Sequence, residues 1–263
     1  MSAIPGVRSI IGVGSGKGGV GKSTVAVNLA VALTEMGAST ALLDADLYGP
    51  SIPTMMGVST RPELDAQERI IPLVSHQVKL ISIGFMVHDG EAIIWRGPML
   101  DQVIKSFTHG VLWGDVDFLI VDLPPGTGDV PLSLAQAVPL TGAVVVTTSQ
   151  EVALADVIRC IALFQEINVP VLGVVENMSG LVCPHCHGEV ALFTPGGGKE
   201  IAYRLGIPLL GQIPFDPQIG MCGDMGLPSV LALPDTPQSE AFRQVARSIM
   251  AQTQNHNASI PSS

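Results

Sequence analysis

The chain has 263 residues, of which 47% are hydrophobic and 14% charged, and its formal net charge is −10. This composition predicts a folded protein with an aliphatic core and excludes an intrinsically disordered chain. The negative charge and the lack of a local basic cluster argue against a nucleic-acid-binding protein. We recognise no signal peptide and no apolar run of the ~18 residues that a membrane span requires, so we expect a cytoplasmic protein without a membrane partner.

Short apolar runs alternate with helix-length segments along the chain. We expect helices at 22–37 and 151–169, and strands at 9–14, 40–46, 78–84, 117–123, 142–148, 170–177 and 208–214. Such alternation predicts an α/β fold, a doubly wound and mostly parallel sheet with helices on both faces. We expect residues 1–250 to form this single domain and the polar residues 251–263 to be a disordered tail.

The first predicted strand is followed by GSGKGGVGKST (14–24), a complete Walker A pattern. Its glycines allow backbone N–H groups to surround phosphate oxygens, and the N-terminus of the next helix adds the positive end of its dipole. We expect Lys22 to reach the β- and γ-phosphates and the hydroxyl of Ser23 to bind Mg²⁺. The pattern predicts a P-loop NTPase fold with these nucleotide-binding residues: Gly16, Lys17, Gly18, Gly19, Val20, Gly21, Lys22, Ser23 and Thr24.

The same loop also satisfies the G-x-G-x-x-G fingerprint of dinucleotide-binding proteins, and the next strand carries the carboxylates Asp44 and Asp46 near its end. A dinucleotide site would leave two lysines and two hydroxyl side chains of the loop without a role. We therefore favour a mononucleotide over NAD.

Two strand ends carry carboxylates that could complete a site for phosphoryl transfer. Asp122 follows four apolar strand residues and fits the Walker B role of holding a Mg²⁺-bound water. Glycines between Asp122 and Asp129 indicate a loop that could respond to the γ-phosphate. Asp129 is equally compatible with a role as a helix cap.

The form KGGVGKST resembles the deviant Walker A motif of the MinD, ParA, nitrogenase iron protein and Mrp/ApbC group. Further segments across roughly residues 7–250 resemble the Mrp/ApbC subfamily of iron–sulfur cluster carrier ATPases: DADLYGPSIPTMMG, IWRGPML, VDLPPGTGDVPLSL, ENMSGLVCPHC and IPFDPQIG. The resemblance implies slow ATP hydrolysis and a homodimer that is bridged by nucleotide. It also implies protein partners that accept the cluster, with scaffold proteins as further candidates.

The resemblance assigns roles to individual residues as well. It implies that Lys17 reaches across the dimer to the phosphates of the partner and that Asp46 orients the attacking water, with Asp44 more structural. It further implies that the adenine contacts Asn177, Pro214 and Asp216. From the residues alone, Asn177 could also be a turn residue and Asp216 a helix cap.

Cys183 and Cys186 form a CPHC motif in the segment 177–194. The same four letters occur in oxidising thioredoxin-like enzymes, but the context here does not fit such a fold. Zinc could be bound by both thiolates with a nearby histidine, of which His185 is disfavoured. A [4Fe–4S] cluster needs four thiolates, and a two-fold dimer presents this pair twice. We favour the bridging iron–sulfur cluster over zinc.

The isolated Cys160 and Cys222 are expected to be small buried hydrophobic residues. A zinc-stabilised partitioning or regulatory ATPase like MinD or ParA is the alternative function, although residues 251–263 lack the basic amphipathic helix that membrane binding would need. A module that binds nucleotide without hydrolysing it is a further alternative.

Overall fold

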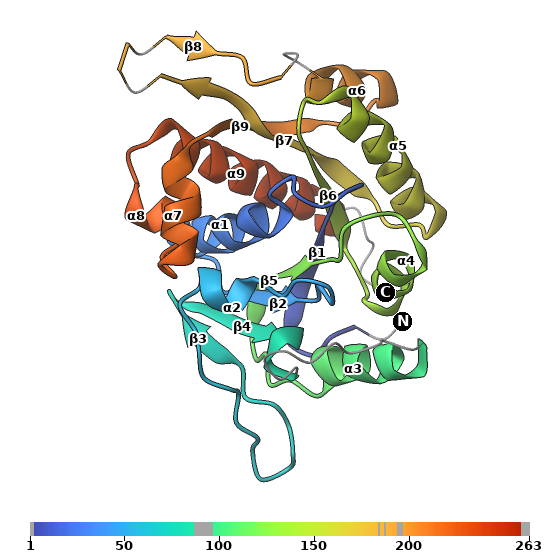
Figure 1. Cartoon of the computed structure of the whole chain (residues 1–263). Helices are drawn as coiled ribbons and strands as arrows, with labels where there is room; N and C mark the ends of the chain where they lie inside the picture. The colour runs from blue at the N-terminus through green and yellow to red at the C-terminus, as the bar shows by residue number, and fades with distance from the viewer. Residues whose placement is uncertain (1–2, 87–96, 184, 187, 194–196, 259–263) are drawn as a thin grey trace.

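The computed structural model describes residues 3–86, 97–183, 185–186, 188–193 and 197–258. Within these residues, nine strands form one sheet in the order β3-β4-β2-β5-β1-β6-β7-β8, and β9 pairs with β7 (Figure 1). The strands are β1 (Val7–Gly14), β2 (Thr40–Asp44), β3 (Leu73–Ser75), β4 (Val78–Ser82), β5 (Val116–Asp122), β6 (Gly142–Thr147), β7 (Val171–Val182), β8 (Glu189–Val190) and β9 (Leu209–Phe215). The helices are α1 (Lys22–Glu35), α2 (Ile52–Met55), the 3₁₀ helix η1 (Ile83–Met86), α3 (Gly97–His109), α4 (Asp129–Ala137), α5 (Glu151–Glu166), α6 (Gly197–Leu205), α7 (Pro217–Asp224), α8 (Ser229–Ala232) and α9 (Pro237–Ala258).

The central strands run parallel, with β1 paired to β5 on one side and to β6 on the other. β2 continues the sheet beyond β5, and its last residue, Asp44, is the register partner of Asp122. Asp122 is in turn the partner of Val13, one residue before β1 ends at Gly14. Because the carboxyl ends of parallel strands meet at one edge, the loops after these three strands lie together there.

An antiparallel pair of strands lies near each end of the sheet. β3 pairs with β4, and β8 pairs with the last residues of β7. Figure 1 shows the β7–β8 hairpin and β3 at opposite ends of the molecule. The CPHC motif lies in the turn of the β7–β8 hairpin, because Val182 is the last residue of β7 and Glu189 the first of β8.

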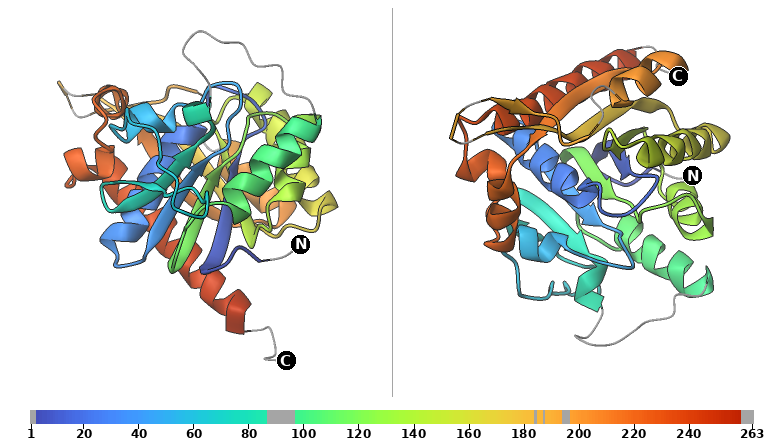
Figure 2. Two further views of the ribbon diagram at one scale, coloured as in Figure 1. Left: turned by 90° about the horizontal axis from the view of Figure 1, so that it is seen from below. Right: turned by 45° about the horizontal axis from the view of Figure 1, so that its top comes forward.

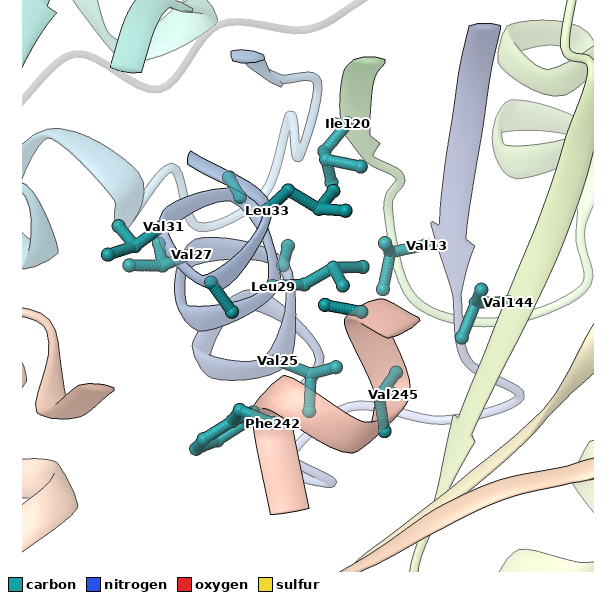
Figure 3. Close-up of a cluster of buried hydrophobic side chains, with 14 of the residues drawn as sticks. Val13, Val25, Val27, Leu29, Val31, Leu33, Ile120, Val144, Phe242 and Val245 are labelled. Atoms are coloured by element: carbon teal, nitrogen blue, oxygen red, sulfur yellow. The ribbon is translucent and has the colours of Figure 1, made fainter. Parts of the chain in front are cut away.

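Apolar cores fill the space on both faces of the sheet, as the alternation of side chains along each strand requires. On one face, Val13, Ile120 and Val144 pack with residues of α1 and α9, and Figure 3 shows Leu29 and Val245 between these helices and the strands. On the other face, a second core packs alternate strand residues against α3, α4 and α5. Figure 2 shows from further directions that the helices enclose the sheet on both sides.

The α/β fold with a mostly parallel sheet is confirmed, and each of the seven predicted strands is present with small shifts at its ends. The sequence reading missed β3 and β8, and it ended β7 at residue 177, whereas the strand continues to Val182. Met178 has a left-handed backbone with φ of 55°, and the pairing with β9 shifts register between Asn177 and Leu181. The strand therefore passes through an irregularity before it reaches the cysteine motif.

The predicted disordered tail is wrong for residues 251–258, because α9 extends through Ala258. Thr253 is buried, and its hydroxyl donates to the carbonyl oxygen of Ile249 one turn earlier. Phe242 and Val245 continue the same buried face. Thr253 thus extends the buried face of α9 beyond the last apolar residues of the helix, because its hydroxyl finds a hydrogen-bond partner within the helix. Residues 259–263 lie outside the described part of the chain.

Candidate functional site

The phosphate loop connects β1 to α1 and is held by close backbone contacts. Gly19 and Gly21 have φ values of 79° and 80°, a region that residues with a Cβ atom rarely adopt. A Cβ atom on Gly16 would lie 2.3 Å from the backbone carbonyl oxygen of Asp156 in α5, and one on Gly21 would lie 2.2 Å from the side-chain nitrogen of Asn177. The glycines are therefore required both by local conformation and by the elements that press against the loop.

Lys22 is the first residue of α1, and its ammonium group lies among carboxylates at the strand ends. Its Nζ atom is 2.6 Å from Oδ1 of Asp122 and 3.3 Å from Oδ2 of Asp46. The Ser23 hydroxyl donates to the other oxygen of Asp122 at 2.5 Å. The structure thus brings together Lys22, Ser23 and Asp122 from the Walker A and Walker B patterns, and it adds Asp46, which the family resemblance selected.

The carboxylate group of Asp122 is completely buried, and this burial raises its pKa, while the nearby Lys22 opposes the shift. Asp46 is 7% exposed and accepts a hydrogen bond from the backbone N–H of Tyr48. Mg²⁺ prefers oxygen ligands, and the oxygen atoms of Ser23 and Asp122 lie next to each other. Ser23 and Asp122 therefore suit the predicted Mg²⁺ site.

Asp44 is structural, as the sequence reading expected. It is fully buried and accepts hydrogen bonds from the Ser82 hydroxyl at 2.8 Å and from the backbone N–H groups of Asp46 and Ile52. Burial, with the neighbouring Asp122 as the second cause, raises the pKa of Asp44 to about 7 from its ordinary value of 3.8. Asp44 thus fixes the loop that carries Asp46.

This raised pKa predicts a specific dependence of stability on pH. Between about pH 4 and 7 the unfolded chain has lost the Asp44 proton while the folded chain keeps it, so stability falls as pH rises, by up to ~1.4 kcal/mol per pH unit. Urea unfolding across this window should show a shallower fall for Asp44→Asn than for the unmodified chain. Equal slopes in the two proteins would contradict the assignment.

The loop borders a cleft of about 600 Å³, within the usual size range of small-molecule sites. Besides the phosphate loop, its lining includes residues that the sequence reading did not select: Gly49, Pro50, Ser51, Thr54, Met55, Pro125 and Asp224. Five of these seven follow Asp46 in the segment DADLYGPSIPTMMG (44–57), so their position in the cleft follows from the end of β2. Asp224 in α7 is 178 residues beyond Asp46, and no motif marks it.

Lys17 lies on the rim of this cleft, and its ammonium group donates to the side-chain oxygen of Gln150 at 3.0 Å. Gln150 is the N-cap residue of α5. The backbone carbonyl oxygen of Lys17 accepts a hydrogen bond from the Ser15 hydroxyl. The two lysines of the loop therefore point to different partners, Lys22 to the buried carboxylates and Lys17 to the start of α5.

The residues predicted near the adenine have separate environments. Asn177 is 7% exposed, and its side chain donates to the carbonyl oxygen of Val20 in the phosphate loop at 2.9 Å. Pro214 lies in β9, and Asp216 is the N-cap of α7, where it accepts from the N–H of Gln218. The alternative reading of Asp216 as a helix cap is thus confirmed. Asn177 is joined directly to the phosphate loop.

Asp129 is an exposed residue and the first residue of α4, whose N-cap is Gly128. Its interpretation as a helix cap is therefore wrong. As an acidic side chain in the first turn, it can still interact favourably with the helix dipole.

The cysteine pair lies at the tip of the β7–β8 hairpin, where the N–H of Cys183 donates to the carbonyl oxygen of Gly188. Cys183 is half-buried and Cys186 exposed. Hydrogen bonds from the backbone N–H groups of Cys186 and His185 lower the pKa of the Cys183 thiol. N–H groups aimed at a sulfur atom favour its thiolate form, which is the form that binds metal.

The other two cysteines are buried, as predicted. Burial raises the pKa of Cys160 to about 12, and it also raises the pKa of Cys222. Among the cysteines of the chain, Cys183 and Cys186 are therefore the accessible pair, and hydrogen bonds favour the thiolate form of Cys183.

A glycine-rich loop between a strand and a helix, with a bonded Lys–Ser–Asp group beneath it, defines a P-loop NTPase. Residues 6–250 match the family model described as ParA, "NUBPL iron-transfer P-loop NTPase". The chain belongs to this family.

Relatives with high identity cover most of the chain. An "Iron-sulfur cluster carrier protein" of Aquifex aeolicus (strain VF5) is 51% identical over 246 residues, which are 93% of this chain and 68% of the relative. The protein of the same description from Escherichia coli (strain K12) is 45% identical over 98% of this chain and 70% of its own length. The "Iron-sulfur cluster transfer protein NUBPL" of Dictyostelium discoideum is 45% identical over 95% of this chain and 78% of its own length.

Solved structures show the same fold. A nucleotide-binding protein of Archaeoglobus fulgidus in complex with ADP is 34% identical, with a TM-score of 0.78, and the match covers 91% of this chain and 93% of that chain. The cell division ATPase MinD of Pyrococcus furiosus is 24% identical, with a TM-score of 0.69 and coverage of 93% and 99%. Among the described residues, no helix is both long and apolar enough to cross a membrane.

Proposed function

We propose that the chain is an ATP-hydrolysing carrier that holds an iron–sulfur cluster at a cysteine pair shared by two subunits and transfers it to apoproteins. The observation that carries this proposal is the presence of two specialised sites in one domain. One is the bonded group of Lys22, Ser23 and Asp122 under the phosphate loop, and the other is the accessible pair Cys183 and Cys186. The names of the relatives as carriers or transfer proteins of iron–sulfur clusters support this combination.

The nucleotide site supplies the groups that phosphoryl transfer needs. Lys22 would contact the β- and γ-phosphates, while Ser23 and Asp122 would hold Mg²⁺ and its water ligands. Asp46 lies 3.3 Å from Nζ of Lys22 and is only 7% exposed, which supports the proposal that it orients a water molecule near the γ-phosphate. The ADP held by the related protein of Archaeoglobus fulgidus supports ATP as the substrate, with Mg²⁺ as its companion ion.

The cysteine pair supports a dimer through stoichiometry. One chain presents two thiols at chelating spacing in an exposed turn, and a [4Fe–4S] cluster takes four thiolates. A two-fold axis near the hairpin tip would bring the second pair into place. Lys17 supports the same assembly, because it lines the cleft and, within the described part of the chain, its ammonium group bonds to a neutral side chain, Gln150, which a partner's phosphate could replace.

Anaerobic reconstitution of the full chain with iron and sulfide tests the cluster site. We expect visible charge-transfer absorption and about four irons per dimer. Cys183→Ala should lose this absorption, because two of the four thiolates of the dimer disappear. Cys222→Ala is the matched control, because this cysteine is buried away from the turn, and it should retain the absorption. Uptake of zinc without iron would contradict the proposal and favour a zinc-stabilised ATPase.

A further inference from the structure

Glu176 is a buried acidic residue that the nucleotide chemistry does not use. It lies in β7 and is completely inaccessible to solvent. One of its side-chain oxygens accepts a hydrogen bond from the backbone N–H of Gly198 at 2.8 Å, and the other accepts from the Gln212 side chain at 3.3 Å. Burial of a carboxyl group is costly unless such partners are present, so this position demands an explanation.

Glu176 and Gly198 lie on either side of the cysteine hairpin in the sequence. From Glu176 the strand β7 continues to Val182, the cysteine turn and β8 follow, and the chain then enters α6, whose second residue is Gly198. Figure 1 shows α6 beside the root of the hairpin formed by β7 and β8. The Glu176–Gly198 hydrogen bond therefore ties the root of the hairpin together across 22 residues of sequence.

The contact at this root is tight. A Cβ atom on Gly198 would lie 2.6 Å from Oε2 of Glu176 and 3.0 Å from its Cβ atom. The helix backbone can thus approach the glutamate side chain only because residue 198 is a glycine. Gly180, within the hairpin, provides a contrast, since a Cβ atom there would meet only the carbonyl oxygen of Val190 at an ordinary 3.6 Å.

The neighbouring residue connects the same point of β7 to the phosphate loop. Side chains of successive strand residues point to opposite faces, so Glu176 faces α6 while Asn177 faces the phosphate loop. Asn177 donates to the carbonyl oxygen of Val20. The hairpin is therefore attached to the body of the protein at a point where β7 also supports the nucleotide loop.

We propose that Glu176 is a positioning residue for the metal-binding cysteines. By holding the start of α6 against β7, it fixes both ends of the hairpin and so limits the arrangements that Cys183 and Cys186 can adopt. Metal affinity then depends on this root contact, although Glu176 itself touches no metal. This inference rests on the proposed function, because it takes the cysteine pair as the metal site.

Cobalt(II) titration of the full chain, followed by thiolate-to-metal charge-transfer absorption, tests the proposal. Glu176→Ala should weaken cobalt binding about tenfold, the lower end of the effects seen when outer supports of metal ligands are removed. Glu176→Gln should bind cobalt within about twofold of the unmodified chain, because its amide oxygen can still accept from the N–H of Gly198. Affinity for Mg-ATP should remain unchanged in both variants, because Glu176 faces away from the phosphate loop.

A pair of glycine variants gives the same test without removing the glutamate. Gly198→Ala should weaken cobalt binding as Glu176→Ala does, because its methyl group would displace the Glu176 side chain. Gly180→Ala should bind cobalt normally. The glycine pair also decides the question if Glu176→Ala does not fold.

The outcomes separate the two proposals. If Glu176→Ala or Gly198→Ala binds cobalt as the unmodified chain does, or if Glu176→Gln is as weak as Glu176→Ala, the positioning role is wrong and the cysteine site stands. If Cys183→Ala leaves cobalt absorption unchanged, the cysteine pair is not the metal site, and the proposed function fails together with this inference.

Discussion

Replacing Lys22 with alanine is expected to abolish measurable ATP hydrolysis and to destabilise the fold. The ammonium group is the cation closest to the expected phosphate position, and loss of such a group costs about 10³-fold or more in rate. It is also 2.6 Å from the fully buried Asp122, and removing one partner of a buried ion pair costs about 3–5 kcal/mol. Phosphate release with Mg-ATP and urea unfolding measure the two effects.

Lys17→Ala is the matched control for this prediction, because it removes the same charge from the same loop. Lys17 is bonded to the neutral Gln150 rather than to a buried carboxylate, so the stability loss should stay below about 1 kcal/mol. Hydrolysis should still fall if Lys17 serves the partner subunit. A Lys22→Ala protein that unfolds at the same urea concentration as Lys17→Ala would contradict the ion-pair argument.

Substituting Gly16 with alanine is expected to have the second large effect. The new methyl group would lie 2.3 Å from the backbone of Asp156, so either the phosphate loop or α5 must move. Strain of this kind costs about 1–3 kcal/mol, and the displaced loop should lose most of its affinity for nucleotide. Binding of a fluorescent ATP analogue and thermal unfolding provide the measurements.

Gly18→Ala supplies the comparison within the same loop. A Cβ atom there would approach only Pro125, at 4.0 Å, and its φ is not in the left-handed region. Its thermal stability should therefore match that of the unmodified chain. If Gly16→Ala is as stable as Gly18→Ala, the contact between the loop and α5 does not constrain the site.

The nucleotide site could largely be predicted from sequence because its parts follow strand ends. The glycine pattern predicted the phosphate loop, the apolar strand before Asp122 indicated a Walker B residue, and the family resemblance selected Asp46; parallel strands bring their carboxyl ends to one edge, where these residues meet. The register of β2 and β5 agrees with this, since Asp44 at the end of β2 is the direct partner of Asp122 at the end of β5.

Contacts between distant segments could not be predicted in the same way. The Lys17–Gln150 bond joins residues 133 positions apart, and nothing local to Gln150 distinguishes it from other polar residues. The Glu176–Gly198 contact depends on how α6 returns to the sheet after an irregular part of β7. Such contacts are set by tertiary packing, which single-sequence patterns do not encode.

The bonding of Lys22 has a consequence for the form in which nucleotide enters the cleft. When a triphosphate takes over the ammonium group, Asp122 is left buried without its counter-charge, unless another cation arrives at the same time. Mg²⁺ bound to the nucleotide would supply that charge, so entry of the complex would exchange one counter-ion of Asp122 for another. The cleft should thus discriminate between Mg-ATP and free ATP by electroneutrality as well as by coordination.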